Sequence, residues 1–320
     1  MKYWLLVLSL FCVFIKAPAQ VDTTYLKALY DRCLDFSEDK IDSMFHYAVL
    51  IKKESDRLQF VKGDVLSLRL KGIYEEMNNN YSVAIEYYLQ SLDASRKLTD
   101  VAYEKAALSD LAIAYANIKE PIKAKEFYIQ AARISKGTGD VYDLVNTYNN
   151  LAVIYTQLKQ FDSARLLLND AIRYGKPYEK ELDLSSTYNN MGNLFCQEKN
   201  YDQALIYFRR NYEQHRVANN PGDLWVDLLN MADVYSEQKR FDSATKYSQL
   251  AMKLAQELES KGKEADSYAI LAKLAEYKGD YRTAYDNLKK WYKLDTAIIN
   301  GDTYKRIAEL QERFHAKERK

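Results

Sequence analysis

The sequence has few of the residues that interrupt helices. Only 4 prolines and 10 glycines occur among its 320 residues. That leaves little turn chemistry for a many-stranded sheet, and it favours long helices joined by short polar turns. Because 48% of the residues are hydrophobic, the chain can bury a large core, and a disordered chain is not expected.

An excess of one charge sign is also lacking. The 46 basic and 45 acidic residues give a formal net charge of +1, so nothing attracts the chain generally to nucleic acid or to an anionic membrane. We expect no nucleic-acid partner. The 3 histidines, His46, His215 and His315, stand without a cysteine or carboxylate pattern, and no glycine-rich phosphate loop occurs. We therefore predict no catalytic residues, no metal and no cofactor.

The N-terminus is typical of an export signal. Lys2 precedes an unbroken apolar run from Tyr3 to Ile15, and Ala17-Pro18-Ala19 offers a small-residue cleavage pattern before Gln20. An uncleaved membrane anchor is the alternative, but the run is short for a bilayer span. We expect an exported, periplasmic protein with no transmembrane segment after cleavage. Its remaining cysteines, Cys33 and Cys196, lie far apart in sequence, so we expect buried free thiols rather than a disulfide.

The chain is rich in one internal repeat. Segments such as FDSARLLLNDAI from Phe161 and FDSATKYSQLAM from Phe241 recur every forty residues, with alanine always fourth. These alanines are Ala84, Ala124, Ala164, Ala204, Ala244 and Ala284. Twelve residues before most of them stands another small residue: Ala112, Ala152, Gly192, Ala232 and Ala272. Since small residues let two helices approach closely, each unit is interpreted as a helix pair that must stack on its neighbours to bury its apolar face.

These positions resemble the tetratricopeptide repeat. Its sequence of leucine, small residue, tyrosine, aromatic and alanines is met by Leu111, Ala112, Tyr115, Ala124, Tyr128 and Ala131, and again by Leu151, Ala152, Tyr155, Phe161, Ala164 and Ala171. The resemblance covers about residues 25–304 and implies an all-α, right-handed superhelical solenoid of antiparallel helix pairs. The period is forty rather than the usual 34 or so, and the closing proline is missing, so we expect longer helices with polar turns.

The predicted organisation has three parts. Residues 1–19 form a signal peptide, residues 20–304 the repeat array, and residues 305–320 a C-terminal capping or connector helix. Within the array, a degenerate repeat at 25–64 precedes six repeats at 65–104, 105–144, 145–184, 185–224, 225–264 and 265–304.

The segment TYNN occurs twice, from Thr147 and from Thr187. In a helix, its tyrosine lies on an apolar stripe while its asparagines cluster on a nearly opposite stripe. In the stacked repeats of this family the second stripe lines the concave surface, so we predict a groove that binds a peptide or a partner protein. The predicted binding residues are Asn146, Asn149, Asn150, Gln157, Asn189, Asn190, Asn193, Gln197, Asn230 and Asp233.

A second interpretation of these asparagines stays open, because a repeated amide can also bond to a neighbouring helix and fix the stacking. Asn150, Asn190 and Asn230 occupy the same position in successive repeats, and Asp110 occupies it one repeat earlier.

Two candidate functions would use the same groove. The first is an exported, non-catalytic interaction scaffold. The second is the sensor arm of a signal-transduction receptor or regulator, because the charged stretch from Thr303 resembles the connector after the periplasmic repeats of bacterial membrane-bound sensor kinases and helix-turn-helix regulators. The sequence carries no signal for a particular oligomeric state.

Overall fold

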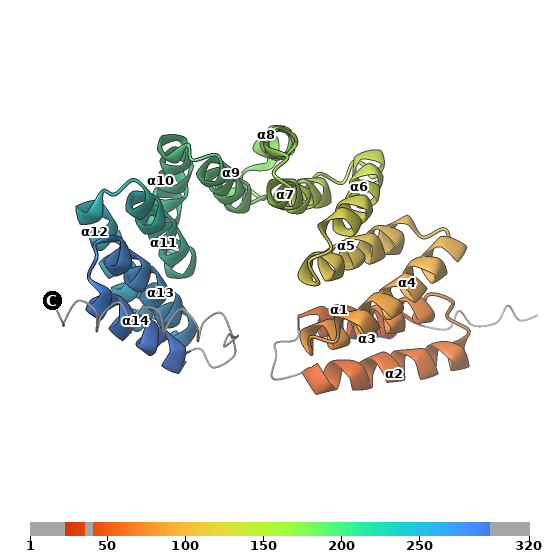
Figure 1. Cartoon of the computed structure of the whole chain (residues 1–320). Coiled ribbons are helices and arrows are strands. Elements are labelled where there is room, and N and C mark those ends of the chain that lie inside the picture. Colours follow the sequence, from red (N-terminus) through yellow and green to blue (C-terminus); the bar gives the residue numbers. More distant parts are fainter. Residues whose placement is uncertain (1–22, 36–40, 295–320) are drawn as a thin grey trace, which may run out of the picture. The chain divides into compact units, whose positions relative to one another are not determined.

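The computed structural model describes residues 23–35 and 41–294, and this part of the chain is all helical (Figure 1). The helices form seven successive pairs: α1 (Thr24–Leu34) and α2 (Ile41–Leu58), α3 (Gly63–Met77) and α4 (Tyr81–Lys97), α5 (Val101–Asn117) and α6 (Pro121–Thr138), α7 (Val141–Gln157) and α8 (Phe161–Gly175), α9 (Ser185–Gln197) and α10 (Tyr201–Val217), α11 (Pro221–Glu237) and α12 (Phe241–Glu257), α13 (Lys261–Tyr277) and α14 (Tyr281–Leu294). The predicted all-α architecture of helix pairs is confirmed. The expected signal peptide and C-terminal helix lie outside the described residues.

The turns repeat every twenty residues. Nearly every helix ends at a residue with positive φ: Gln59, Asn79, Thr99, Lys119, Gly139, Lys159, Lys199, Asn219, Lys239, Glu259 and Gly279. At a typical end, the backbone N–H of Gln160 donates to the carbonyl of Tyr155, and that of Lys159 donates to Thr156. This bonding satisfies the last carbonyls of the helix and reverses the chain within three residues. Polar side chains then cap several of the next helices, as Asp140 does for α7 by accepting from the N–H of Asp143.

The small residues of the repeat are the contact points within the pairs. The six alanines spaced by forty are all fully buried. At Gly192 in α9, an added Cβ would lie 2.5 Å from Cε1 of Phe208 in α10, closer than carbon atoms can pack. The aromatic ring therefore fills the space that the glycine leaves, as the sequence predicts for the spacing of twelve.

The chain divides into two compact units at Ile134 and Ser135, inside α6. In the first unit, α2 to α5 enclose a core that includes Leu66, Leu70, Tyr88 and Leu111. In the second unit, α7 to α14 pack consecutively around cores that contain Leu168, Phe208 and Trp225 among others. Within the described residues, no helix combines the length and the hydropathy that crossing a membrane requires.

The second unit departs from the repeat between α8 and α9. A short 3-10 helix, η2 (Lys176–Tyr178), follows α8, and Glu179 has φ of −60° where the twenty-residue period predicts a left-handed residue. Helix α9 then begins at Ser185, four residues later than the helices forty residues away on either side would place it. Close packing holds this linker, because an added Cβ on Gly175 would lie 2.6 Å from Cδ2 of Leu184. The stacking of α9 on the pair before it therefore differs from the other layers.

Candidate functional site

Side chains on the first helices of successive pairs bond to each other across a spacing of forty-one residues. In the first unit, Arg69 of α3 donates to both oxygens of Asp110 in α5, at 2.5 and 3.1 Å. In the second unit, Nδ2 of Asn230 in α11 donates to Oδ1 of Asn189 in α9 at 2.7 Å. At these two places the repeated polar position fixes the stacking of layers, which favours the structural interpretation for Asp110 and Asn230.

The equivalent bond between α7 and α9 is absent. Asn149 and Asn190 stand forty-one residues apart at the same positions, but the side-chain oxygen of Asn149 is buried without a hydrogen-bond partner. Asn190 makes no side-chain hydrogen bond to any described residue and is half-buried. A buried amide oxygen without a partner costs about 1–3 kcal/mol. The amides of Asn149 and Asn190 are thus not bonded to each other, and we call this layer between α7 and α9 the open layer.

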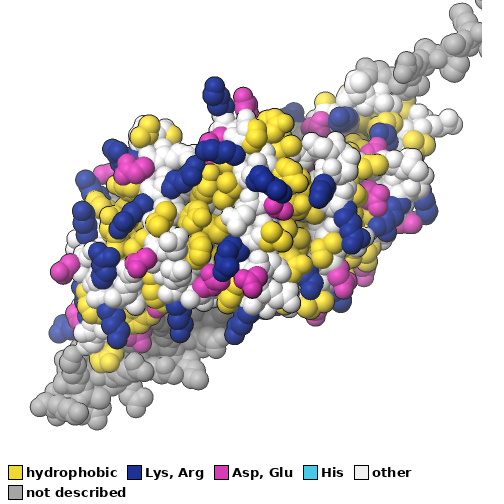
Figure 2. Space-filling model, turned by 90° about the horizontal axis from the view of Figure 1, so that it is seen from above, with side chains coloured by type: hydrophobic (Ala, Val, Ile, Leu, Met, Phe, Trp, Pro, Cys, Tyr) yellow, Lys and Arg dark blue, Asp and Glu magenta, His cyan; other side chains and the backbone are white. Residues whose placement is uncertain are grey.

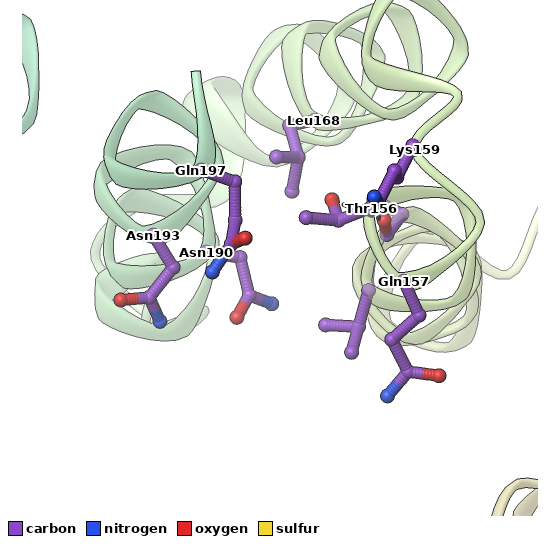
Figure 3. A pocket seen from close by; sticks show the side chains of 9 residues that line it. Thr156, Gln157, Lys159, Leu168, Asn190, Asn193 and Gln197 are labelled. Atoms are coloured by element: carbon purple, nitrogen blue, oxygen red, sulfur yellow. Dashed lines mark hydrogen bonds between the residues drawn. The ribbon is translucent and has the colours of Figure 1, made fainter. Parts of the chain in front are cut away.

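A pocket of about 330 Å³ lies at this open layer, between the α7–α8 pair and α9 (Figure 3). Figure 3 shows Asn190, Asn193 and Gln197 of α9 on one side of the pocket and Thr156 and Gln157 of α7 on the other, with Leu168 of α8 between the two groups. Its lining is Ala152, Val153, Thr156, Gln157, Lys159, Leu168, Asn190, Asn193 and Gln197. The pocket thus combines an apolar floor with four side-chain amides, and Lys159 brings the one formal charge among these nine residues.

The structure brings together only part of the predicted site. Gln157, Asn190, Asn193 and Gln197 line the pocket just described. Asn146 and Asn150 of α7 are exposed but line neither this pocket nor the second one described below. Whether any of them binds a ligand stays a prediction.

Asp233 takes part in an ion-pair network, and its predicted binding role stays a prediction. Nζ of Lys273 in α13 lies 2.6 Å from Asp233 and 2.9 Å from Glu237, and the hydroxyl of Tyr277 donates to Glu237 at 2.8 Å. The hydrogen bond from Lys273 holds the pKa of Glu237 below its usual value. These contacts join α11 to α13.

A second pocket, which we did not predict from the sequence, lies where α9, α10 and α11 meet. Nδ1 of His215, in the last turn of α10, is 2.6 Å from Oδ2 of Asp227 in α11, and its Nε2 is 3.0 Å from Oγ of Ser185 at the start of α9. All three residues are buried, and burial raises the pKa of Asp227 to about 6. His215 is a buried histidine, and the sequence did not reveal its partners because they come from neighbouring helices, twelve residues after it and thirty residues before it.

The order Asp227, His215, Ser185 is that of a nucleophile relay, but the hydrogen bonds run in the opposite direction. Oγ of Ser185 lies 2.6 Å from Oδ1 of Asp183, and an ionised carboxylate can only accept. The serine hydroxyl therefore donates to Asp183, and Nε2–H of His215 donates to the serine. A serine activated by histidine needs the reverse arrangement, in which the hydroxyl donates to Nε2.

Neither cysteine offers a reactive thiolate. Both are free thiols, as the sequence predicts; Cys33 is buried as expected, whereas Cys196 is only half-buried. Burial raises the pKa of Cys33 to about 11 and that of Cys196 to about 12, so both stay protonated at neutral pH.

Charges of both signs are mixed on the surface. On the face in Figure 2, lysine and arginine side chains alternate with acidic side chains and with small apolar areas, and no broad area of one sign is seen.

Comparisons with known proteins identify the fold. Residues 102–175 match the family model described as tetratricopeptide repeat. No curated protein matches the chain by sequence. Among solved structures, BtubC from P. vanneervenii is 23% identical over 69% of this chain and 92% of that chain, with a TM-score of 0.60.

Two further structures extend over most of the chain. A Rap protein solved in complex with Competence and Sporulation Factor is 16% identical over 92% of each chain, with a TM-score of 0.59. Aspartyl phosphate phosphatase F from Bacillus subtilis is 15% identical over 92% of this chain and 85% of that chain, with a TM-score of 0.64. At these identities the likeness concerns the fold alone.

Proposed function

We propose that this tetratricopeptide repeat chain is a protein-interaction scaffold that binds an extended peptide segment at the open amide layer between α7 and α9. The fold suggests an interaction scaffold, and the position of the site is our inference. The single observation that carries it is the pocket of about 330 Å³ that is lined by the side-chain amides of Gln157, Asn190, Asn193 and Gln197 and by apolar side chains.

The chemistry of the pocket suits a peptide backbone. Each side-chain amide offers two donor hydrogens and an acceptor oxygen, so it can bond to both the N–H and the C=O of an extended chain. The apolar floor of Ala152 and Leu168 adds room for one small side chain of the ligand. Recognition through backbone groups would tolerate many ligand sequences.

The relation to the Rap protein supports this proposal by analogy of fold. That protein was solved in complex with Competence and Sporulation Factor, and it is similar to our chain over 92% of each chain. A helix-pair solenoid of comparable extent can therefore hold a bound partner. The analogy carries over no residue roles at 16% identity.

We also propose that the scaffold works after export, on the grounds of the apolar run and the small-residue pattern before Gln20. The charged stretch from Thr303 keeps the sensor-arm role as the second candidate, with the same binding layer as its input site. Intact mass and membrane partitioning of the native protein separate the two roles. A soluble chain that begins at Gln20 supports the exported scaffold, and a membrane-bound form supports the sensor arm.

The binding proposal is tested by selecting peptides from a random ten-residue phage library on the purified protein. The double variant Asn190→Ala/Asn193→Ala should then weaken the selected peptides at least tenfold, with the melting temperature unchanged within about 1 °C, because neither side chain bonds to another described residue. The affinity is measured by fluorescence anisotropy of labelled peptides.

The matched control is Asn169→Ala/Gln249→Ala, which removes two exposed amides from α8 and α12 outside the pocket. This control should leave affinity unchanged. Equal loss in both variants, or unchanged affinity in the Asn190/Asn193 variant, would refute the site. A large drop in melting temperature with binding retained would assign these amides to stacking.

A further inference from the structure

The second pocket, between α9, α10 and α11, has a lining that favours acceptors. It measures about 130 Å³ and is lined by Asp183, Ser185, Ser186, Asn189, Asn211, His215, Asp223, Val226 and Asp227. Three of the nine are carboxylates, and none is a lysine or an arginine. The pocket is small enough that it admits one side-chain terminus rather than a folded partner.

Three polar side chains of this lining already bond to one another or to the backbone. Nδ2 of Asn211 donates to the carbonyl of Ser185 at 2.9 Å. The hydroxyl of Ser185 donates to Asp183, and the ring of His215 bonds to Ser185 and Asp227. Nδ2 of Asn220 donates to Oδ2 of Asp223 at 2.6 Å, whereas the side-chain oxygen of Asn211 accepts from no described residue.

Asn211 is therefore the residue that points most directly to a ligand. Its side chain is 1% exposed and lines the pocket, and its Oδ1 has no hydrogen-bond partner. A buried acceptor without a partner costs free energy that a ligand donor would recover. This oxygen and the carboxylates beside it point to a ligand group that only donates.

The charge of the pocket also indicates a ligand group that donates hydrogen bonds, and one that is positively charged. Asp183 and Asp223 each contribute one negative charge at neutral pH. The contact between Nδ1 of His215 and Oδ2 of Asp227 is 2.6 Å long. While one hydrogen lies in this contact, the net charge of the two side chains is zero, whichever of the two atoms carries the hydrogen. Nε2 of His215 also lies 4.0 Å from Asp223, too far for a hydrogen bond. Two negative charges therefore face a small cavity that has no compensating lysine or arginine.

We propose that the pocket between α9, α10 and α11 binds an organic cation, either a guanidinium or a primary ammonium group. Such groups donate several hydrogen bonds, accept none and carry the required charge. The inference rests on the proposed function for the source of the cation, which is a basic side chain or the amino terminus of the bound peptide. The two pockets adjoin along α9, because Asn189 lines this one and Asn190 lines the other.

The protonation of Asp227 gives the binding a pH dependence. Burial raises the pKa of this carboxyl to about 6, with His215 and Asp223 as the charged groups that act on it and Asp183 as the carboxylate beyond Ser185. A cation in the pocket favours the ionised carboxylate and expels the proton. Affinity should therefore rise between about pH 5 and pH 7.5.

The test uses free cations rather than a peptide. N-acetyl-arginine amide and n-butylammonium are titrated into the full chain, and the side-chain amide signals of Asn211 are followed by NMR after selective asparagine labelling. We expect saturable shifts with a millimolar dissociation constant, and the better of the two probes identifies guanidinium or ammonium. Acetyl-citrulline amide, which has nearly the same shape without the charge, should give no saturable shift.

Two variants and a control complete the test. Asp227→Asn should weaken the binding of the better probe at least tenfold. Asp223→Asn should weaken it at least threefold, and this change leaves the fold intact because the side chain is half-exposed. Asp242→Asn removes the same charge from an exposed position on α12 and should change nothing. The proposal would be overturned if the citrulline compound binds or if Asp242→Asn weakens the probe as much as the pocket variants do. It would also be overturned if sodium chloride at the same ionic strength displaces the shifts as well as the organic cation does.

This outcome is separable from the proposed function. If the probes fail while selected peptides still require Asn190 and Asn193, the cation site is wrong and the peptide layer stands. If the probes bind and no peptide is selected, the cation site stands without the peptide layer, and its ligand is then a small cation.

Discussion

The buried carboxyl of Asp227 predicts an unusual dependence of stability on pH. Its pKa is about 6 in the folded protein, against 3.8 for the free side chain, because burial disfavours the ionised form. A difference of roughly 2 units, at about 1.36 kcal/mol per unit, corresponds to about 3 kcal/mol. Asp227 is only 2% exposed, so solvent screening reduces this value little.

The sign follows from which state holds the proton. Between about pH 3.8 and pH 6 the folded protein keeps the Asp227 proton while the unfolded chain loses it. The protonated carboxyl therefore stabilises the fold fully below about pH 3.8, and this contribution is lost as the pH rises through about 6. Asp227→Asn cannot titrate and lacks the contribution at every pH.

The measurement is urea unfolding, followed by circular dichroism, of the wild type and Asp227→Asn at several pH values from 4 to 7.5 and constant ionic strength. The unfolding free energy of the wild type minus that of the variant should fall by as much as about 3 kcal/mol across this range. The other carboxylates are present in both proteins and largely cancel. A difference that is flat with pH, or a side-chain carboxyl signal of Asp227 that titrates near its ordinary value in carbon NMR, would refute the reasoning.

Two further predictions concern packing and turns. Gly192→Ala should lower the unfolding free energy by about 1–3 kcal/mol, because the new Cβ would meet the ring of Phe208 at 2.5 Å. The control Gly262→Ala should be neutral or slightly stabilising in the same urea assay, because no atom lies within 4 Å of its new Cβ. Lys239→Gly should raise the melting temperature, with a gain of up to about 1 kcal/mol, because Lys239 has φ of 56° and glycine adopts this conformation without steric cost. A loss of stability in this variant would mean that the lysine side chain itself stabilises the turn.

Much of the fold could be predicted because the repeat is local. An alanine recurs every forty residues, with a small residue twelve positions before it. Both indicate contacts within one helix pair, whose two helices are neighbours along the chain. The burial of Ala84 and Ala284 and the contact of Gly192 with Phe208 follow this rule. The polar turns follow it as well, since left-handed residues recur every twenty residues from Gln59 to Gly279, except at Glu179.

The candidate site could be predicted only as a set of amides. The sequence puts Asn149, Asn189, Asn190 and Asn230 on one stripe, and nothing in their identities separates those that bond to a neighbouring layer from those that do not. The tertiary structure separates them, because Asn230 reaches Asn189 while Asn149 and Asn190 do not meet.

By itself, then, the sequence determined what depends on neighbours along the chain: the helical class, the pairs, the turns and the small residues at their contacts. The tertiary structure alone decided what depends on distances between layers. Ser185, His215 and Asp227 come from three helices, and only the packing of α9, α10 and α11 places them within hydrogen-bonding distance. Periodicity shows which face a side chain occupies, whereas a hydrogen bond of about 3 Å depends on how two helices are displaced against each other, and no local pattern specifies that displacement.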